Sequence, residues 1–112
     1  MRVLLDQGAP GPLRAGLTGH DVSTAYEMGW ARLDNGALLD AAEGKFDILV
    51  TTDRNLRFQQ RLTGRRLAIL VLPTTSWPKI RAHAVEVTAA VIALRPGDLK
   101  MPDFSDSNTS IE

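Results

Sequence analysis

The feature that most constrains the fold is a series of short apolar runs separated by turn residues. The two strongest runs are residues 48–50 and 67–72, in which every residue is apolar. A strand covered on one face alternates apolar and polar residues, whereas continuous runs are typical of parallel strands buried on both faces. The chain therefore favours a parallel sheet with helices on both sides.

The other segments fit an alternation of strands and helices. The last helix is the clearest, because Ser76 or Trp77 can cap it, Pro78 fits its first turn, and apolar residues recur every three or four positions up to Leu94. The element order predicts an α/β fold, a three-layer α/β/α sandwich with a mainly parallel sheet of four or five strands. Weaker strands are expected at residues 3–5, 22–25 and 99–101, and further helices at 12–17, 35–43 and 55–62.

Composition limits the class of protein. The 112 residues include no cysteine, which excludes disulfides and thiolate metal sites, and 13 basic residues balance 13 acidic ones. We expect one domain over residues 1–102 and a mobile acidic tail over 103–112. No apolar run approaches the length of about 18 residues that a membrane span needs, and no secretion signal precedes the first strand, so a cytoplasmic protein is expected.

Two carboxylates follow predicted strands. Asp6 comes directly after residues 3–5, and Asp53 follows residues 48–50 after two threonines. The carboxyl ends of parallel strands share one edge of a sheet, and ligands bind there. If the strands are neighbours, the carboxylates lie about 5 Å apart and repel by roughly 3 kcal/mol at an effective dielectric of about 20, so they need a shared proton or cation. Oxygen ligands without cysteine favour Mg²⁺ or Mn²⁺.

The alternative interpretation is that each aspartate caps the helix that follows it. Two such residues at one edge favour a site over two separate caps. Glu27 and Asp34 are candidates to complete an acidic cluster, although Asp34 is also placed to cap the helix beginning at residue 35. Asp40 fits a solvated helix surface.

Five segments together resemble a known family. They are residues 2–6, 19–22, 27–30, 34–39 and 46–56, the last of which includes Thr51-Thr52-Asp53-Arg54. In order and spacing they resemble the short bacterial PIN-like proteins, relatives of VapC-type toxin ribonucleases, over residues 2–99. The resemblance implies a ribonuclease in which Asp6 and Asp53 bind Mg²⁺ or Mn²⁺ and Glu27 and Asp34 supplement the catalytic cluster. It also implies a small antitoxin protein as partner and a homodimer.

The chain departs from the family where relatives often carry acids, because it has Gln7, Asn35 and Ala37. This leaves open a catalytically degenerate PIN-like module that binds RNA or a partner protein without cutting. A phospho-accepting receiver domain has a similar layout. It requires an acidic pair after the first strand, where this chain has Asp6-Gln7, so the sequence argues against it.

Basic residues cluster directly after Asp53. On a helix Arg54, Arg57 and Arg61 would lie within about 60° of one another. Such a stripe is suited to the phosphates of an RNA substrate. A solvated helix face is the alternative, because Phe58 and Leu62 lie beside the stripe.

Overall fold

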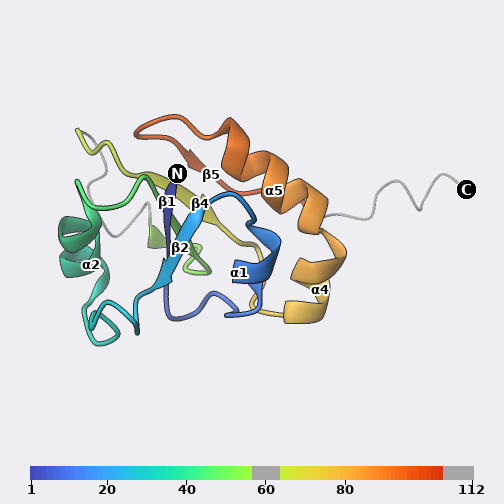
Figure 1. Cartoon of the computed structure of the whole chain (residues 1–112), viewed down its shortest axis with the longest axis horizontal. Coiled ribbons are helices and arrows are strands. Elements are labelled where there is room, and N and C mark those ends of the chain that lie inside the picture. Colours follow the sequence, from blue (N-terminus) through green and yellow to red (C-terminus); the bar gives the residue numbers. More distant parts are fainter. Residues whose placement is uncertain (57–63, 105–112) are drawn as a thin grey trace, which may run out of the picture.

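The computed structural model of the chain describes residues 1–56 and 64–104. The strands form one sheet in which every neighbouring pair is parallel, in the order β2-β1-β3-β4-β5. Figure 1 shows the strands with the helices around them. The expected parallel sheet is therefore confirmed, with five strands. Their bounds are β1 (Arg2–Leu5), β2 (Asp21–Thr24), β3 (Ile48–Thr51), β4 (Ala68–Val71) and β5 (Leu99–Lys100).

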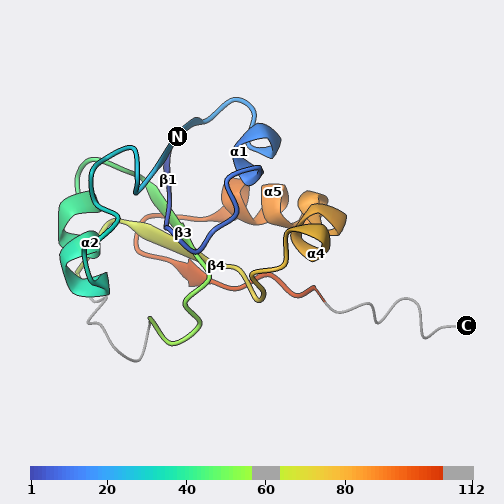
Figure 2. The ribbon, with the colours of Figure 1, turned by 90° about the horizontal axis from the view of Figure 1, so that it is seen from below.

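Helices cover both faces of this sheet. One face packs against α1 (Leu13–Gly16), α4 (Trp77–Ala82) and α5 (Ala84–Ala93), and the other packs against α2 (Asn35–Ala42). Figure 2 shows the sheet between α2 on one side and the other three helices on the opposite side. The strands contribute alternate residues to the two cores, as their continuous apolar runs require. The three-layer α/β sandwich is confirmed.

The predicted single C-terminal helix is in fact two helices. Ser76 caps α4 by accepting a hydrogen bond from the Lys79 N–H, as expected. The helix then breaks at His83, whose φ of −112° and ψ of 28° leave the helical region. The His83 ring stacks on Phe104 at 4.6 Å between centroids and contacts Glu86 Oε2 at 3.1 Å. The apolar spacing did not reveal the break because it continues through His83 into α5.

Parts of two predicted elements lie outside the described residues. The predicted helix at 55–62 is described only as far as Leu56, which is buried on the α2 side of the sheet. Of the predicted tail, Asp103 and Phe104 are described, and Phe104 packs against the core on the α4 and α5 side. Within the described part of the chain, no helix is both long and apolar enough to cross a membrane.

The strand order reverses between β1 and β3, because β2 lies on one side of β1 and the later strands lie on the other. After β1 the chain crosses to α1 on one face, and after β3 it continues to Leu56 on the other face. Connections that leave neighbouring strands for opposite faces open a crevice at the carboxyl ends of those strands. We call the side of the sheet where the strands end the carboxyl edge. The side where the strands begin is the amino edge.

Candidate active site

Asp6 and Asp53 both lie at the carboxyl edge, after neighbouring strands. Leu5 of β1 pairs with Val50 of β3, and the Asp6 N–H extends this pairing by donating to the Val50 carbonyl at 2.8 Å. Asp53 follows two residues after Thr51, the last residue of β3. The strand register therefore brings the two acids to the same end of the β1–β3 pair, at the crevice.

A single threonine connects the two acids. Thr51 Oγ1 donates a hydrogen bond to Asp6 Oδ2 at 2.9 Å and accepts one from the Asp53 N–H at 3.1 Å. Thr51 is 1% exposed and is the buried polar residue among those described. Sequence reasoning missed this role, although a polar residue that ends an apolar strand next to a candidate ligand was the available signal.

The remaining carboxylate oxygens have local partners. Asp6 Oδ1 accepts from the Gln7 N–H at 2.7 Å, and Asp53 Oδ1 accepts from the Asn55 N–H at 3.0 Å. Asp53 Oδ2 accepts from Asn35 Nδ2 at 2.6 Å. Each acid therefore has one oxygen held by a nearby main-chain amide, as a capping residue would, and one oxygen held by a side chain.

Asn35 comes to the site from the start of α2. This is the position at which the resemblance to PIN-like proteins leads us to expect an acid. A carboxamide donates to Asp53 where a carboxylate would repel it. The substitution therefore removes one negative charge and one anionic ligand from the crevice.

The loop after β1 packs closely against the segment after β3. A Cβ atom added to Gly8 would lie 2.4 Å from Thr52 Oγ1, a separation that real Cβ atoms do not adopt. Glycine at position 8 therefore allows this close approach of the two segments.

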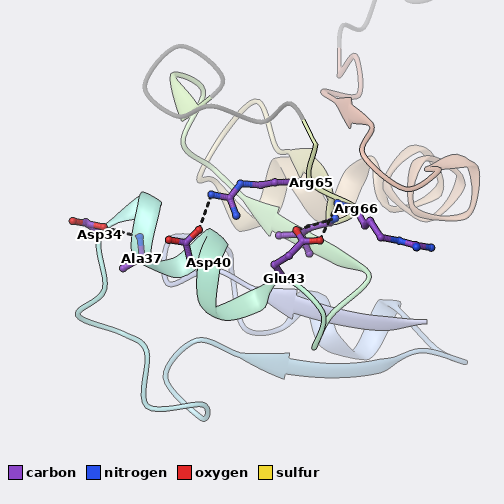
Figure 3. Close-up of polar contacts among 7 residues, drawn as sticks. Asp34, Ala37, Asp40, Glu43, Arg65 and Arg66 are labelled. Carbon is purple, nitrogen blue, oxygen red and sulfur yellow. Dashed lines mark hydrogen bonds and ion pairs between the residues drawn. The ribbon is translucent and has the colours of Figure 1, made fainter.

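The other predicted acids have different partners. Glu27 forms an ion pair with Arg14 and accepts a hydrogen bond from the Thr24 N–H at 2.9 Å. The hydrogen bond from Arg14, followed by that from Thr24, holds the pKa of Glu27 below its usual value. Asp34 Oδ1 accepts from the Ala37 N–H at 2.9 Å and so caps α2 (Figure 3). Across residues 1–56 and 64–104, no three Asp, Glu, His or Cys side chains are grouped to hold a metal ion.

The basic stripe is described only at its first member. Arg54 directly follows Asp53 and is exposed. Arg57 and Arg61 lie outside the described residues. Of the three predicted phosphate contacts, Arg54 is therefore the one that the structure describes.

The donor set fits one hard cation. Mg²⁺ commonly binds through one or two carboxylates and fills its remaining positions with water and substrate oxygens. Asp6 and Asp53 offer two carboxylates, with the adjacent Thr51 hydroxyl orienting the first. With Asn35 in place of an acid, these residues suit a single ion better than a pair of ions.

Comparison of the chain with protein-family models, curated proteins and solved structures gives no match. A statement about function therefore rests on the fold and on the arrangement of Asp6, Thr51 and Asp53 at the carboxyl edge. The resemblance to PIN-like proteins adds an expectation about the reaction.

Proposed function

We propose that this protein is a metal-dependent endoribonuclease of the PIN type, in which Asp6 and Asp53 bind Mg²⁺ or Mn²⁺. The observation that carries the proposal is the pair of aspartates that Thr51 joins at the crevice between β1 and β3. Among the described residues, neither acid forms an ion pair. Their negative charge is therefore available to a cation.

Each residue has a distinct part in this proposal. When bound, the cation would polarise a phosphate oxygen and make water a stronger nucleophile. Thr51 holds Asp6 Oδ2, and the Asn55 N–H and Asn35 hold the two oxygens of Asp53, so both carboxylates are oriented before a ligand arrives. Arg54, which is exposed and directly follows Asp53, would contact a phosphate of the RNA strand.

The partners follow from the same resemblance. A ribonuclease of this type acts on RNA in the cytoplasm, and a small antitoxin protein neutralises it. Two copies of the chain would form a homodimer. Glu27 and Asp34 have lesser roles in this proposal, because one is paired with Arg14 and the other caps α2.

The test is Mn²⁺ binding by calorimetry together with cleavage of a labelled RNA. Asp6→Asn and Asp53→Asn should each lower cleavage by at least about a hundredfold and weaken Mn²⁺ binding, because each removes an anionic ligand. Asp21→Asn is the control, since Asp21 is exposed at the start of β2 on the amino edge. Cleavage that persists in Asp6→Asn while the fold is intact would refute the proposal.

The second candidate is a degenerate PIN-like module that binds RNA or a protein without cutting. It is favoured by one observation, the carboxamide of Asn35 2.6 Å from Asp53 Oδ2. Asn35→Asp separates the two candidates. In an active enzyme it should tighten Mn²⁺ binding about tenfold, since a third carboxylate faces the ion. A wild-type chain that binds RNA but not Mn²⁺, and gains Mn²⁺ binding only in Asn35→Asp, would identify the degenerate module.

A further inference from the structure

A pocket lies at the amino edge, at the opposite end of the strands from Asp6 and Asp53. It has a volume of about 420 Å³ and lies among the starts of β1, β3 and β4 and the segments that follow α2 and α5. Its lining combines apolar side chains with arginines. The apolar residues are Met1, Phe46, Ile48, Ala68, Leu94 and Pro96, and the arginines are Arg2, Arg66 and Arg95.

The two acids in this pocket are bound to the main chain. The oxygens of Glu43 accept hydrogen bonds from the N–H groups of Arg66 at 2.9 Å and Leu67 at 3.3 Å. Asp47 Oδ2 accepts from the Arg2 N–H at 2.7 Å and lies 3.8 Å from Arg2 Nε. These carboxylates hold the strands together and do not pair with the guanidinium groups of Arg66 or Arg95.

Two guanidinium groups in the pocket, those of Arg66 and Arg95, form no ion pair with its two acids. Among the described residues, neither Arg66 nor Arg95 forms a side-chain ion pair, and both are exposed. Figure 3 shows the Arg66 side chain extending away from the carboxylate of Glu43. Three arginines thus line a partly apolar pocket that also holds two carboxylates.

The backbone holds the two arginines near each other. The Gly97 N–H donates to the Arg66 carbonyl at 3.0 Å, and Asp98 Oδ2 accepts from the Arg95 N–H at 3.0 Å. Gly97 has φ of +83°, and a Cβ there would lie 3.0 Å from the Arg65 carbonyl oxygen. This turn fixes the main chain after α5 against the start of β4, so the backbone positions of Arg66 and Arg95 are set before a ligand binds.

We propose that this pocket binds the phosphate group of a nucleotide or of an RNA chain, and that Arg66 and Arg95 donate hydrogen bonds to the phosphate oxygens. The planar guanidinium group matches phosphate oxygens in pairs, and the apolar lining suits an attached ribose or base. The proposal is independent of the proposed function, because the pocket shares no residue with the Asp6 and Asp53 site.

A competing role for these arginines is structural. The helices α2 and α5 end at this edge, and basic residues stabilise the carboxyl ends of helices. That role alone would affect stability without creating a binding site. The experiment must therefore measure binding and stability in the same variants.

The test is a ¹H–¹⁵N NMR titration of the full chain without divalent cations, at constant ionic strength. The probes are inorganic phosphate, adenosine monophosphate and a six-nucleotide RNA. We expect saturable shifts at Arg2, Arg66 and Gly97, and about tenfold weaker binding in Arg66→Gln and in Arg95→Gln. Arg81→Gln on α4 is the control, because Arg81 is exposed and does not line the pocket.

The outcomes separate the sources of phosphate. Tightest binding of adenosine monophosphate supports a free nucleotide, and tightest binding of the RNA supports a contact with the strand. The proposal is overturned if no localised shifts occur, or if Arg66→Gln and Arg95→Gln lower the melting temperature while binding is unchanged. Neither result depends on cleavage, so the failure of this proposal is distinct from the failure of the ribonuclease proposal.

Discussion

The two edges of the sheet use carboxylates in different ways. At the amino edge, Asp47 and Glu43 accept hydrogen bonds from main-chain N–H groups of residues 45 and 23 positions away in sequence. At the carboxyl edge, Asp6 and Asp53 accept main-chain bonds from residues only one and two positions further on. Their other oxygens are held by the side chains of Thr51 and Asn35.

This difference indicates which acids are free to take a ligand. The bond that the Arg2 N–H donates to Asp47 Oδ2 joins distant parts of the chain at the start of β1, beside the bond from the Asp47 N–H to the Arg2 carbonyl. A bond from a side-chain hydroxyl or amide can be exchanged for a bond to a cation with little movement of the backbone. At the amino edge the acids therefore hold the main chain together, and Arg66 and Arg95 are free to bind an anion. At the carboxyl edge the acids are free to bind a metal ion.

The largest effect is expected from Thr51→Val, which breaks the link at the carboxyl edge. Valine has a similar shape but leaves Asp6 Oδ2 without its donor and the Asp53 N–H without its acceptor. The free energy of unfolding should fall by about 2 kcal/mol, because a buried polar group loses its partner. Urea denaturation measures this loss, and RNA cleavage should fall with it.

Thr51→Ser is the matched control, because serine keeps the hydroxyl and loses only a methyl group. It should retain most of the cleavage activity. If Thr51→Val cleaved RNA and bound Mn²⁺ as well as Thr51→Ser does, Thr51 would be a packing residue and the link between the acids would be irrelevant to function.

The sequence was sufficient to predict the sheet and the position of Asp6 and Asp53 after strands. The strands at residues 48–50 and 67–72 could be recognised because burial on both faces removes polar residues from the run. The break at His83 could not, since the apolar spacing continues through it, and the ring contact of His83 is with Phe104, which is distant in sequence. Apolar periodicity is insensitive to a contact of that kind.

The roles of Thr51 and of the arginine pocket also lay beyond the sequence. Thr51 connects the two acids only because β1 and β3 are neighbours, and the strand order is a property of the whole chain. The pocket depends on the turn at Gly97, which brings Arg95 beside Arg66. The local pattern marks Thr51 as a polar residue that ends an apolar strand, but it contains neither the strand order nor the turn.

A smaller effect is expected from Gly97→Ala at the amino edge. Alanine is strained at φ of +83°, and its Cβ would crowd the Arg65 carbonyl oxygen. We expect the free energy of unfolding to fall by about 1 kcal/mol and phosphate binding at the pocket to weaken, because the turn that holds Arg95 moves. Urea denaturation and the NMR titration measure the two effects.

Gly11→Ala is the control for this change, since a Cβ at position 11 meets no atom within 4 Å. It should leave stability and phosphate binding nearly unchanged. If Gly97→Ala weakened RNA cleavage as strongly as it weakened phosphate binding, the two edges would be coupled, and the contrast between them would fail.

The smallest effect is expected from Glu27→Gln, which tests an acid that already has a cationic partner. Arg14 lowers the pKa of Glu27 in the folded chain, so the ionised carboxylate stabilises the fold above its ordinary pKa of 4.5. This contribution should disappear as the pH falls through the lowered pKa. The stability difference between the wild type and Glu27→Gln should therefore be constant near neutral pH and shrink below about pH 4.5.

The variant Arg14→Gln tests whether Arg14 causes the pH-dependent stabilisation by Glu27. Arg14→Gln should remove the same pH-dependent difference, and the double variant should add little to either single change, because both remove one interaction. Half-exposed ion pairs are weak, so urea denaturation at low ionic strength is the suitable measurement. If Glu27→Gln instead reduced Mn²⁺ binding as strongly as Asp6→Asn, Glu27 would belong to the metal site, and the carboxyl edge would hold a third available acid.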